Sequence, residues 1–141
     1  MDLFLARPGK ILEIELLSYF RHAQFNLTGN HLSRQGLVDF LRDADGAIVS
    51  LDKIDSDVLD ECLSLKIIAK HGVGLDNLDL EECGKRGINI GWTPGVNRLS
   101  VAEQTISLMT GLVRNVFQSN YELRNGNWRK AGGYQLSGRT I

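Results

Sequence analysis

The sequence lacks the features that mark several protein classes. Only two cysteines are present, Cys62 and Cys83, and they stand in apolar or helical contexts rather than as a close pair. We therefore expect buried free thiols in a reducing cytoplasm instead of a disulfide framework. The three histidines, His22, His31 and His71, have no metal-ligand spacing. We predict no metal site.

Charge and apolar runs are equally limited. Sixteen lysines and arginines against seventeen acidic residues give a formal net charge of −1, so no long-range field gathers nucleic acid or an anionic membrane. No apolar run reaches the ~18–20 residues that span a bilayer. The N-terminus has no basic region of the signal-peptide kind. With 43% apolar residues in 141 positions, we expect a cytoplasmic domain with one core and neither nucleic-acid nor membrane partners.

Short apolar runs alternate with helical patterns through the first two thirds of the sequence. Ser33 and Asp55 are candidate helix N-caps, the second opening a helix that places Leu63 inward, and Asp79-Leu80-Glu81-Glu82 has the form of a capping box. This alternation is typical of a parallel sheet with both faces covered. We predict an α/β fold, a flavodoxin-like open parallel sheet with helices on both faces, over residues 1–98. Strands are expected at residues 3–6, 25–28, 47–50, 67–69 and 88–90, and the first helix at residues 10–22.

The character of the sequence changes after residue 98. Ser100-Val101-Ala102-Glu103 is a second capping box, and it predicts a long helix to about Phe117 that is apolar around much of its circumference. A shorter helix at residues 118–124, a turn and a glycine-containing arm to Ile141 follow. Such a helix requires neighbours on more than one side, so we expect a homodimer through residues 100–141.

Gly72-Val73-Gly74 is the first candidate for chemistry. It follows directly on a predicted strand, where an open α/β sheet presents its ligand crevice. Two glycines around a small residue let successive N–H groups converge on a carboxylate, although a tight strand-to-helix turn explains the motif equally well. The motif is not a dinucleotide fingerprint, because Asn77 occupies the place of the third glycine and no helix starts there.

Two longer motifs resemble one known family. Thr93-Pro94-Gly95-Val96-Asn97-Arg98-Leu99-Ser100-Val101-Ala102-Glu103 resembles the hinge of the D-isomer-specific 2-hydroxyacid dehydrogenases, which include D-3-phosphoglycerate dehydrogenase. The run from Lys70 to Asp79 resembles their substrate loop. The resemblance implies that Gly72, Val73, Gly74 and Asn97 bind substrate, with the amides of Val73 and Gly74 on its carboxylate. It further implies that Val73 and Val101 border the nicotinamide of NAD.

The resemblance also implies which parts of the enzyme this chain contains and which it lacks. In the family, a glycine-rich fingerprint follows soon after a segment like the one that ends here at Ile141, and the catalytic Arg, Glu and His belong to later sequence. Residues 1–98 are thus expected to be the substrate-binding lobe, and residues 99–141 the hinge helix and arm of a truncated NAD-binding domain. The parent would transfer hydride between NAD(H) and a small 2-hydroxy or 2-oxo acid. This chain alone, without catalytic residues or bound cofactor, is expected to be inactive.

One position departs from the phosphoglycerate-specific pattern. Ser50 stands where members acting on phosphoglycerate commonly carry an arginine, and the nearest cation is Lys53. Lysine is a poorer bidentate clamp for phosphate than arginine, which argues against a phosphorylated substrate.

Two other function classes are compatible with a flavodoxin-like strand order. One is a stand-alone binding or regulatory module without catalysis. The other is a receiver-like signalling domain, which needs clustered carboxylates at the end of its first strand. Leu3-Phe4-Leu5-Ala6-Arg7-Pro8 offers none, which argues strongly against it.

Overall fold

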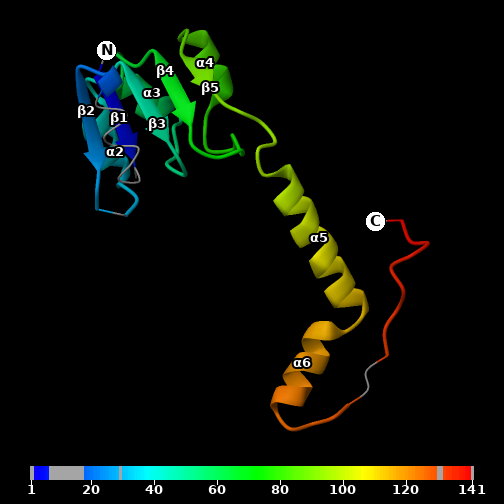
Figure 1. Cartoon of the computed structure of the whole chain (residues 1–141). Helices are drawn as coiled ribbons and strands as arrows, with labels where there is room; N and C mark the ends of the chain where they lie inside the picture. The colour runs from blue at the N-terminus through cyan, green and yellow to red at the C-terminus, as the bar shows by residue number, and fades with distance from the viewer. Residues whose placement is uncertain (1, 7–17, 29, 130–131, 141) are drawn as a thin grey trace. The chain divides into compact units, whose positions relative to one another are not determined.

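The computed structural model describes residues 2–6, 18–28, 30–129 and 132–140 (Figure 1). The chain divides into two compact units, Met1–Pro94 and Gly95–Ile141, and each is described by itself.

The first unit is built on a parallel sheet of five strands. The strands are β1 (Asp2–Ala6), β2 (His22–Asn26), β3 (Gly46–Val49), β4 (Ile67–Lys70) and β5 (Asn89–Gly91), in the order β2-β1-β3-β4-β5. In register, Leu5 lies opposite Phe25 and Ile48, and Ile48 lies opposite Ala69. The order confirms the predicted flavodoxin-like α/β fold. Because every strand runs the same way, all their carboxyl ends lie along one edge of the sheet.

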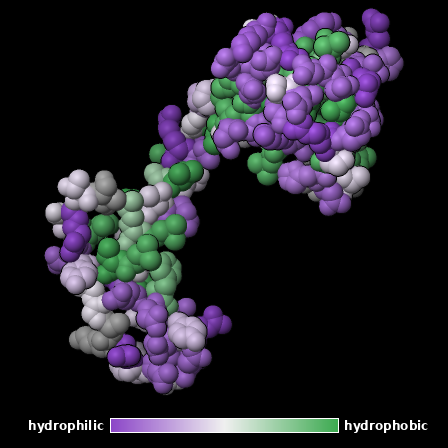
Figure 2. All heavy atoms as spheres, turned by 180° about the vertical axis from the view of Figure 1, so that it is seen from behind, coloured by the Kyte–Doolittle hydropathy of each residue, from purple (hydrophilic) through white to green (hydrophobic). Residues whose placement is uncertain are grey.

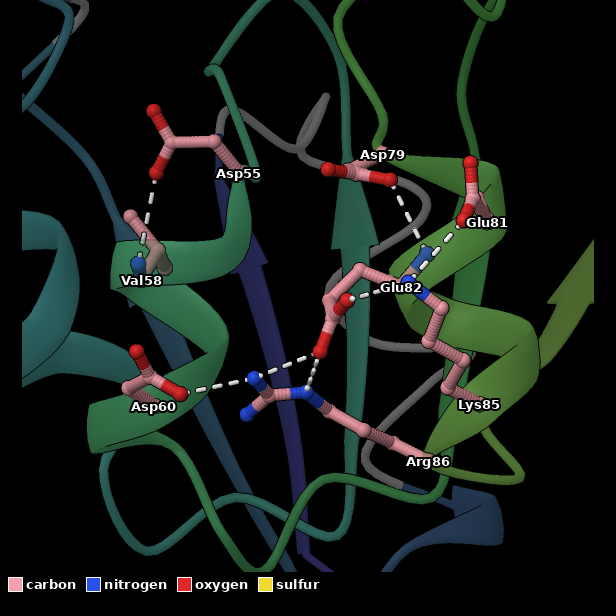
Figure 3. Close-up of polar contacts among 8 residues, drawn as sticks. All are labelled: Asp55, Val58, Asp60, Asp79, Glu81, Glu82, Lys85 and Arg86. Atoms are coloured by element: carbon pink, nitrogen blue, oxygen red, sulfur yellow. Dashed lines mark hydrogen bonds and ion pairs between the residues drawn. The ribbon is translucent and has the colours of Figure 1, made fainter.

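Three helices of this unit lie on one face of the sheet. They are α2 (Arg34–Leu41), α3 (Ser56–Glu61) and α4 (Leu80–Lys85). Right-handed crossovers place the helices that follow β2, β3 and β4 on the same side. Contacts agree, because α2 packs against α3, and Arg86 joins Asp60 of α3 at 2.7 Å to Glu82 of α4 at 2.8 Å (Figure 3).

The first helix and the second strand differ from expectation. Most of the predicted helix at 10–22 falls on residues 7–17, outside the described residues, and with it the expected cover of the other face. Its predicted end is wrong, because His22 already belongs to β2. The strand expected at 25–28 ends at Asn26, where the Asn26 side chain accepts from the Thr28 N–H at 3.1 Å and turns the chain.

Local capping positions the other helices as predicted. Ser33 accepts a hydrogen bond from the Gly36 N–H at 3.1 Å. Figure 3 shows the other two caps, where Asp55 accepts from the Val58 N–H at 3.3 Å and Asp79 from the Glu82 N–H at 2.9 Å. The prediction that Leu63 faces the core was wrong. Helix α3 ends at Glu61, so the helical spacing stops before Leu63, which is 83% exposed.

The core lies between these helices and the strands. Its fully buried members come from every layer of the described unit, and include Leu41, Val49, Ile54, Val58, Leu59, Cys62, Ile68 and Cys83. Both cysteines are free, and burial raises the pKa of each thiol. Such thiols are apolar packing groups rather than reactive thiolates.

The second unit contains the two predicted helices, but the break between them comes earlier than expected. Helix α5 (Arg98–Val113) begins two residues before the predicted start, so the expected capping box at Ser100 is wrong. The Ser100 hydroxyl instead donates to the Asn97 carbonyl at 2.8 Å. Helix α6 (Val116–Arg124) follows a break at Asn115, whose φ of 54° is left-handed. Asparagine tolerates that conformation better than most residues.

The break lets the chain fold back on α5. The Phe117 ring lies so close to Gly111 that a Cβ there would come within 2.6 Å of it. The arm then returns to the same end of the helix, where the Tyr134 N–H donates to the Val113 carbonyl at 2.8 Å and the Asn115 amide donates to the Gly132 carbonyl. A Cβ at Gly133 would likewise lie 2.8 Å from the Val113 carbonyl oxygen, so both glycines permit close approaches that a side chain would prevent.

Large apolar side chains remain exposed on this unit. Figure 2 shows hydrophobic residues gathered on its surface, and they include Leu99, Val101, Ile106, Leu108, Leu112, Val116 and Phe117. Among the described residues, no helix is both long and apolar enough to cross a membrane.

Candidate functional site

The candidate site lies at the carboxyl edge of the sheet. Three loops leave it there: residues 50–53 after β3, residues 71–77 after β4, and the segment beginning at Trp92 after β5. Open α/β sheets bind their ligands in this position.

The two glycines of the glycine loop (residues 72–74) are there for different reasons. Gly72 is needed for its backbone conformation, and Gly74 for the space around it. Gly72 has a φ of 128°, which L side chains rarely adopt. Gly74 has no such constraint, but a Cβ there would lie 2.7 Å from Oδ1 of Asp76. Neither the Val73 nor the Gly74 backbone N–H donates a hydrogen bond to any part of the chain that is described. Two neighbouring donors are thus available to an anion.

Trp92 holds this loop from the neighbouring strand end. Its indole N–H donates to the Val73 carbonyl at 2.9 Å. The bond fixes the Val73 carbonyl and leaves the N–H groups on either side of that residue free to face a ligand. Trp92 was not among the predicted site residues, because no sequence motif links it to the glycine loop.

Lys70 and Asn77 join the loops after β3 and β4. The Lys70 ammonium donates to the Ser50 carbonyl and to Oδ1 of Asn77, the latter at 2.6 Å. The Asn77 amide nitrogen donates to the Asp52 carbonyl at 2.7 Å, and the Asn77 carbonyl accepts from the Ile54 N–H at 2.9 Å. Neither side chain was among the predicted site residues. The one sequence feature that pointed to them is the polar Asn77 in the place of a third glycine.

The position of the missing arginine carries no guanidinium group. The Ser50 carbonyl accepts hydrogen bonds from the Lys70 ammonium and from the Asn77 amide nitrogen. Lys53 lies 3.4 Å from a carboxylate oxygen of Asp55. The charge nearest to Ser50 in sequence is therefore already paired.

The other two predicted site residues belong to the second unit. Asn97 is exposed and precedes the first residue of α5, where its side chain makes no capping hydrogen bond. Val101 lies in the first turn of that helix and is half exposed. The structure thus brings Gly72, Val73 and Gly74 together with Lys70, Asn77 and Trp92, whereas it describes Asn97 and Val101 within a separate unit.

The described residues of the site do not form a set of metal ligands. In the described ranges, no three His, Cys, Asp or Glu side chains come close enough to hold a metal ion. The site offers backbone donors and one ammonium group, which suit a small organic anion.

Comparison with known proteins identifies the family. A family model described as "D-isomer specific 2-hydroxyacid dehydrogenase, catalytic domain" matches residues 10–134. The chain belongs to this family. It is 33% identical over 121 residues to hydroxypyruvate reductase of Thermotoga maritima, and 38% identical over 116 residues to glyoxylate reductase of Thermofilum pendens. It also resembles the crystal structure of NAD+-bound 3-phosphoglycerate dehydrogenase from Entamoeba histolytica, with 27% identity and a TM-score of 0.71.

These dehydrogenases are longer than the present chain. The matches cover 84%, 77% and 96% of this chain but only 40%, 34% and 43% of the three proteins, respectively. The chain therefore spans less than half the length of each relative.

Proposed function

We propose that this chain is the N-terminal, substrate-binding portion of an NAD-dependent D-2-hydroxyacid dehydrogenase. The whole protein would transfer hydride reversibly between NAD(H) and C2 of a 2-hydroxy or 2-oxo acid. Family membership supports the reaction class, and the similarity to hydroxypyruvate and glyoxylate reductases supports a small 2-oxo acid as substrate. The alternative of a stand-alone, non-catalytic module gains no support from these comparisons.

The observation that carries the proposal is the pair of free donors in the glycine loop. The N–H groups of Val73 and Gly74 adjoin each other at the ligand-binding edge of the sheet, and neither has an acceptor in the described protein. A carboxylate has two oxygens and accepts hydrogen bonds from such groups. We assign this loop to the substrate carboxylate, and we assign Asn97 to orientation of the substrate.

The residues present do not fit the whole cofactor. The sequence contains no Gly-x-Gly-x-x-Gly run, so nothing here cradles a pyrophosphate. We propose that Val73 and Val101 border only the nicotinamide end, and that residues 99–141 are the hinge helix and arm of an NAD-binding domain. The part played by this chain is to bind and orient the acid, because the cofactor supplies the hydride.

The surroundings of Ser50 favour an unphosphorylated substrate in a protein otherwise similar to phosphoglycerate dehydrogenase. A phosphate clamp needs an unpaired cation with two parallel donors, which arginine provides and lysine does not. Here Ser50 has no guanidinium group, and Lys53 pairs with Asp55.

Two further proposals concern assembly and location. The exposed apolar residues of α5 and α6 favour a homodimer through residues 100–141, because a lone chain rarely leaves so many apolar side chains in water. The two free, buried thiols suit the reducing cytoplasm, where we place the protein.

A valine at position 74 tests the carboxylate site. Gly74→Val places a side chain where the substrate must approach the two amides, and its clash with Asp76 is with a side-chain end that can move. Gly84→Val is the matched control, because a Cβ at Gly84 meets nothing within 4 Å. Pyruvate should shift the amide NMR signals of Val73 and residue 74 in the unmodified chain and in the control, but not in Gly74→Val. Equal shifts in all three proteins would show that the glycine loop is a turn and nothing more.

A further inference from the structure

Lys70 differs from the other lysines that the structure describes. Lys53, Lys66 and Lys85 each pair with a carboxylate, at 3.4 Å to Asp55, 2.5 Å to Asp45 and 2.9 Å to Glu81. Lys70 forms no ion pair with any described residue, and both of its acceptors, the Ser50 carbonyl and the Asn77 side-chain amide, are neutral. Its positive charge is therefore held in place without being cancelled by a contacting carboxylate.

The charge lies beside the glycine loop. The Lys70 side chain runs so near to Gly72 that a Cβ on Gly72 would lie 3.6 Å from Cε of Lys70. Lys70 is the last residue of β4, and Asn77 lies on the far side of the loop, so the Lys70–Asn77 hydrogen bond closes the segment that contains the glycines. The bond to Ser50 ties this closed segment to the end of β3.

We propose that Lys70 is a positioning residue for the substrate carboxylate, acting through the glycine loop. It holds the loop in the conformation that presents the Val73 and Gly74 amides, and its ammonium supplies a positive charge that offsets the carboxylate of Asp76, which lies next to Gly74. This inference rests on the proposed function of the loop. It adds that the site selects for the charge of the acid and not only for its hydrogen-bonding shape.

The physical basis is the weak screening of a half-buried charge. A fixed ammonium near the base of a loop lowers the free energy of any anion that binds to the loop, and solvent screens it less than it screens a surface lysine. A neutral ligand of the same shape gains nothing from this field. The effect of Lys70 should therefore depend on the charge of the ligand.

The experiment compares Lys70→Gln, Lys70→Arg and the control Lys66→Gln in the 141-residue chain. Lys66 precedes the opposite end of the same strand and is also a single lysine, so its replacement makes the same change in net charge. Each protein is titrated with pyruvate and with its neutral methyl ester, and amide NMR shifts are followed. Hydrogen exchange of the amides at residues 72–77 is measured without ligand.

Lys70→Gln should bind pyruvate about tenfold more weakly than the unmodified chain, with no loss for the methyl ester. Its amides at residues 72–77 should exchange faster, while Lys66→Gln leaves both readouts unchanged and Lys70→Arg retains most of the affinity. The inference is overturned if Lys70→Gln binds pyruvate normally, if Lys66→Gln loses as much, or if the ester is affected equally.

Failure of the proposed function itself gives a different pattern. In that case the unmodified chain shows no pyruvate-induced shift at Val73 and Gly74, which removes the electrostatic role of Lys70 along with the carboxylate site. The hydrogen-exchange comparison still decides whether Lys70 holds the loop. Unchanged exchange in Lys70→Gln would remove that role as well.

Discussion

Replacing Asn77 with alanine should destabilise the first unit out of proportion to the size of the change. The Asn77 side chain accepts from the Lys70 ammonium at 2.6 Å and donates to the Asp52 carbonyl at 2.7 Å, with a longer bond of 3.3 Å to the Ser50 carbonyl. Alanine removes all three bonds but leaves the backbone bond from the Ile54 N–H to the Asn77 main-chain carbonyl intact. The variant therefore isolates the contribution of the side chain.

The expected magnitude follows from the two shorter bonds. A hydrogen bond to a charged group contributes about 1.5 kcal/mol or more, and a neutral amide–carbonyl bond about 1 kcal/mol. Asn77→Ala should thus lower the free energy of unfolding by about 2–3 kcal/mol. The control is Gln35→Ala, which removes an exposed amide hydrogen bond to Asp39 of 2.9 Å and should cost less than about 0.5 kcal/mol.

Urea denaturation followed by tryptophan fluorescence measures the difference. Trp92 reports on the first unit because its indole is bonded to the Val73 carbonyl, and a Trp128→Phe background removes the other tryptophan. A loss for Asn77→Ala no larger than that for Gln35→Ala would refute the reasoning. It would mean that Lys70 and the Asp52 carbonyl find equivalent partners in water.

Three other predictions concern acid stability, assembly and activity. Hydrogen bonds from Arg86 hold the pKa of Glu82 below its ordinary value of 4.5, so this pair stabilises the fold above that pH and loses its effect as the pH falls through the folded-state pKa. The urea midpoint of Arg86→Gln should therefore lie below that of the unmodified chain at pH 7, and this difference should become smaller below about pH 4.5. A difference that stays constant with pH would contradict the assignment. Leu108→Glu with Leu112→Glu should convert a dimer into a monomer in light scattering while the spectrum of the first unit is kept, and a monodisperse monomer for the unmodified chain would rule the dimer out. The purified chain should show no NADH oxidation with glyoxylate or hydroxypyruvate, and turnover proportional to its concentration would contradict this.

The sequence predicted those parts of the fold that depend on local chemistry. The caps at Ser33, Asp55 and Asp79 were correct because each side chain reaches a backbone N–H only three residues away. The flavodoxin-like fold followed from the alternation of buried strands with helices. These features need no knowledge of distant contacts.

The break between α5 and α6 was not predictable in the same way. The apolar spacing runs on past Val113, so periodicity alone continues the helix to Phe117. The break at Asn115 is stabilised by the Phe117 ring against Gly111 and by the returning arm at Gly132 and Tyr134. Contacts with a segment some twenty residues later decided the outcome, and no pattern within the helix encodes them.

The candidate site also depends on contacts that the sequence pattern does not reveal. These contacts show how the glycine loop differs from a nucleotide-binding loop. The sequence singled out the glycines, but Asn77 counted only as a failed third glycine. In the structure Asn77 holds the Lys70 ammonium and the Asp52 carbonyl across 7 and 25 positions of sequence. A dinucleotide fingerprint keeps its loop small so that a helix N-terminus can meet a diphosphate. Here a polar side chain and an ammonium brace the loop instead. The donors available are two adjacent amides, which match a single carboxylate better than a pyrophosphate.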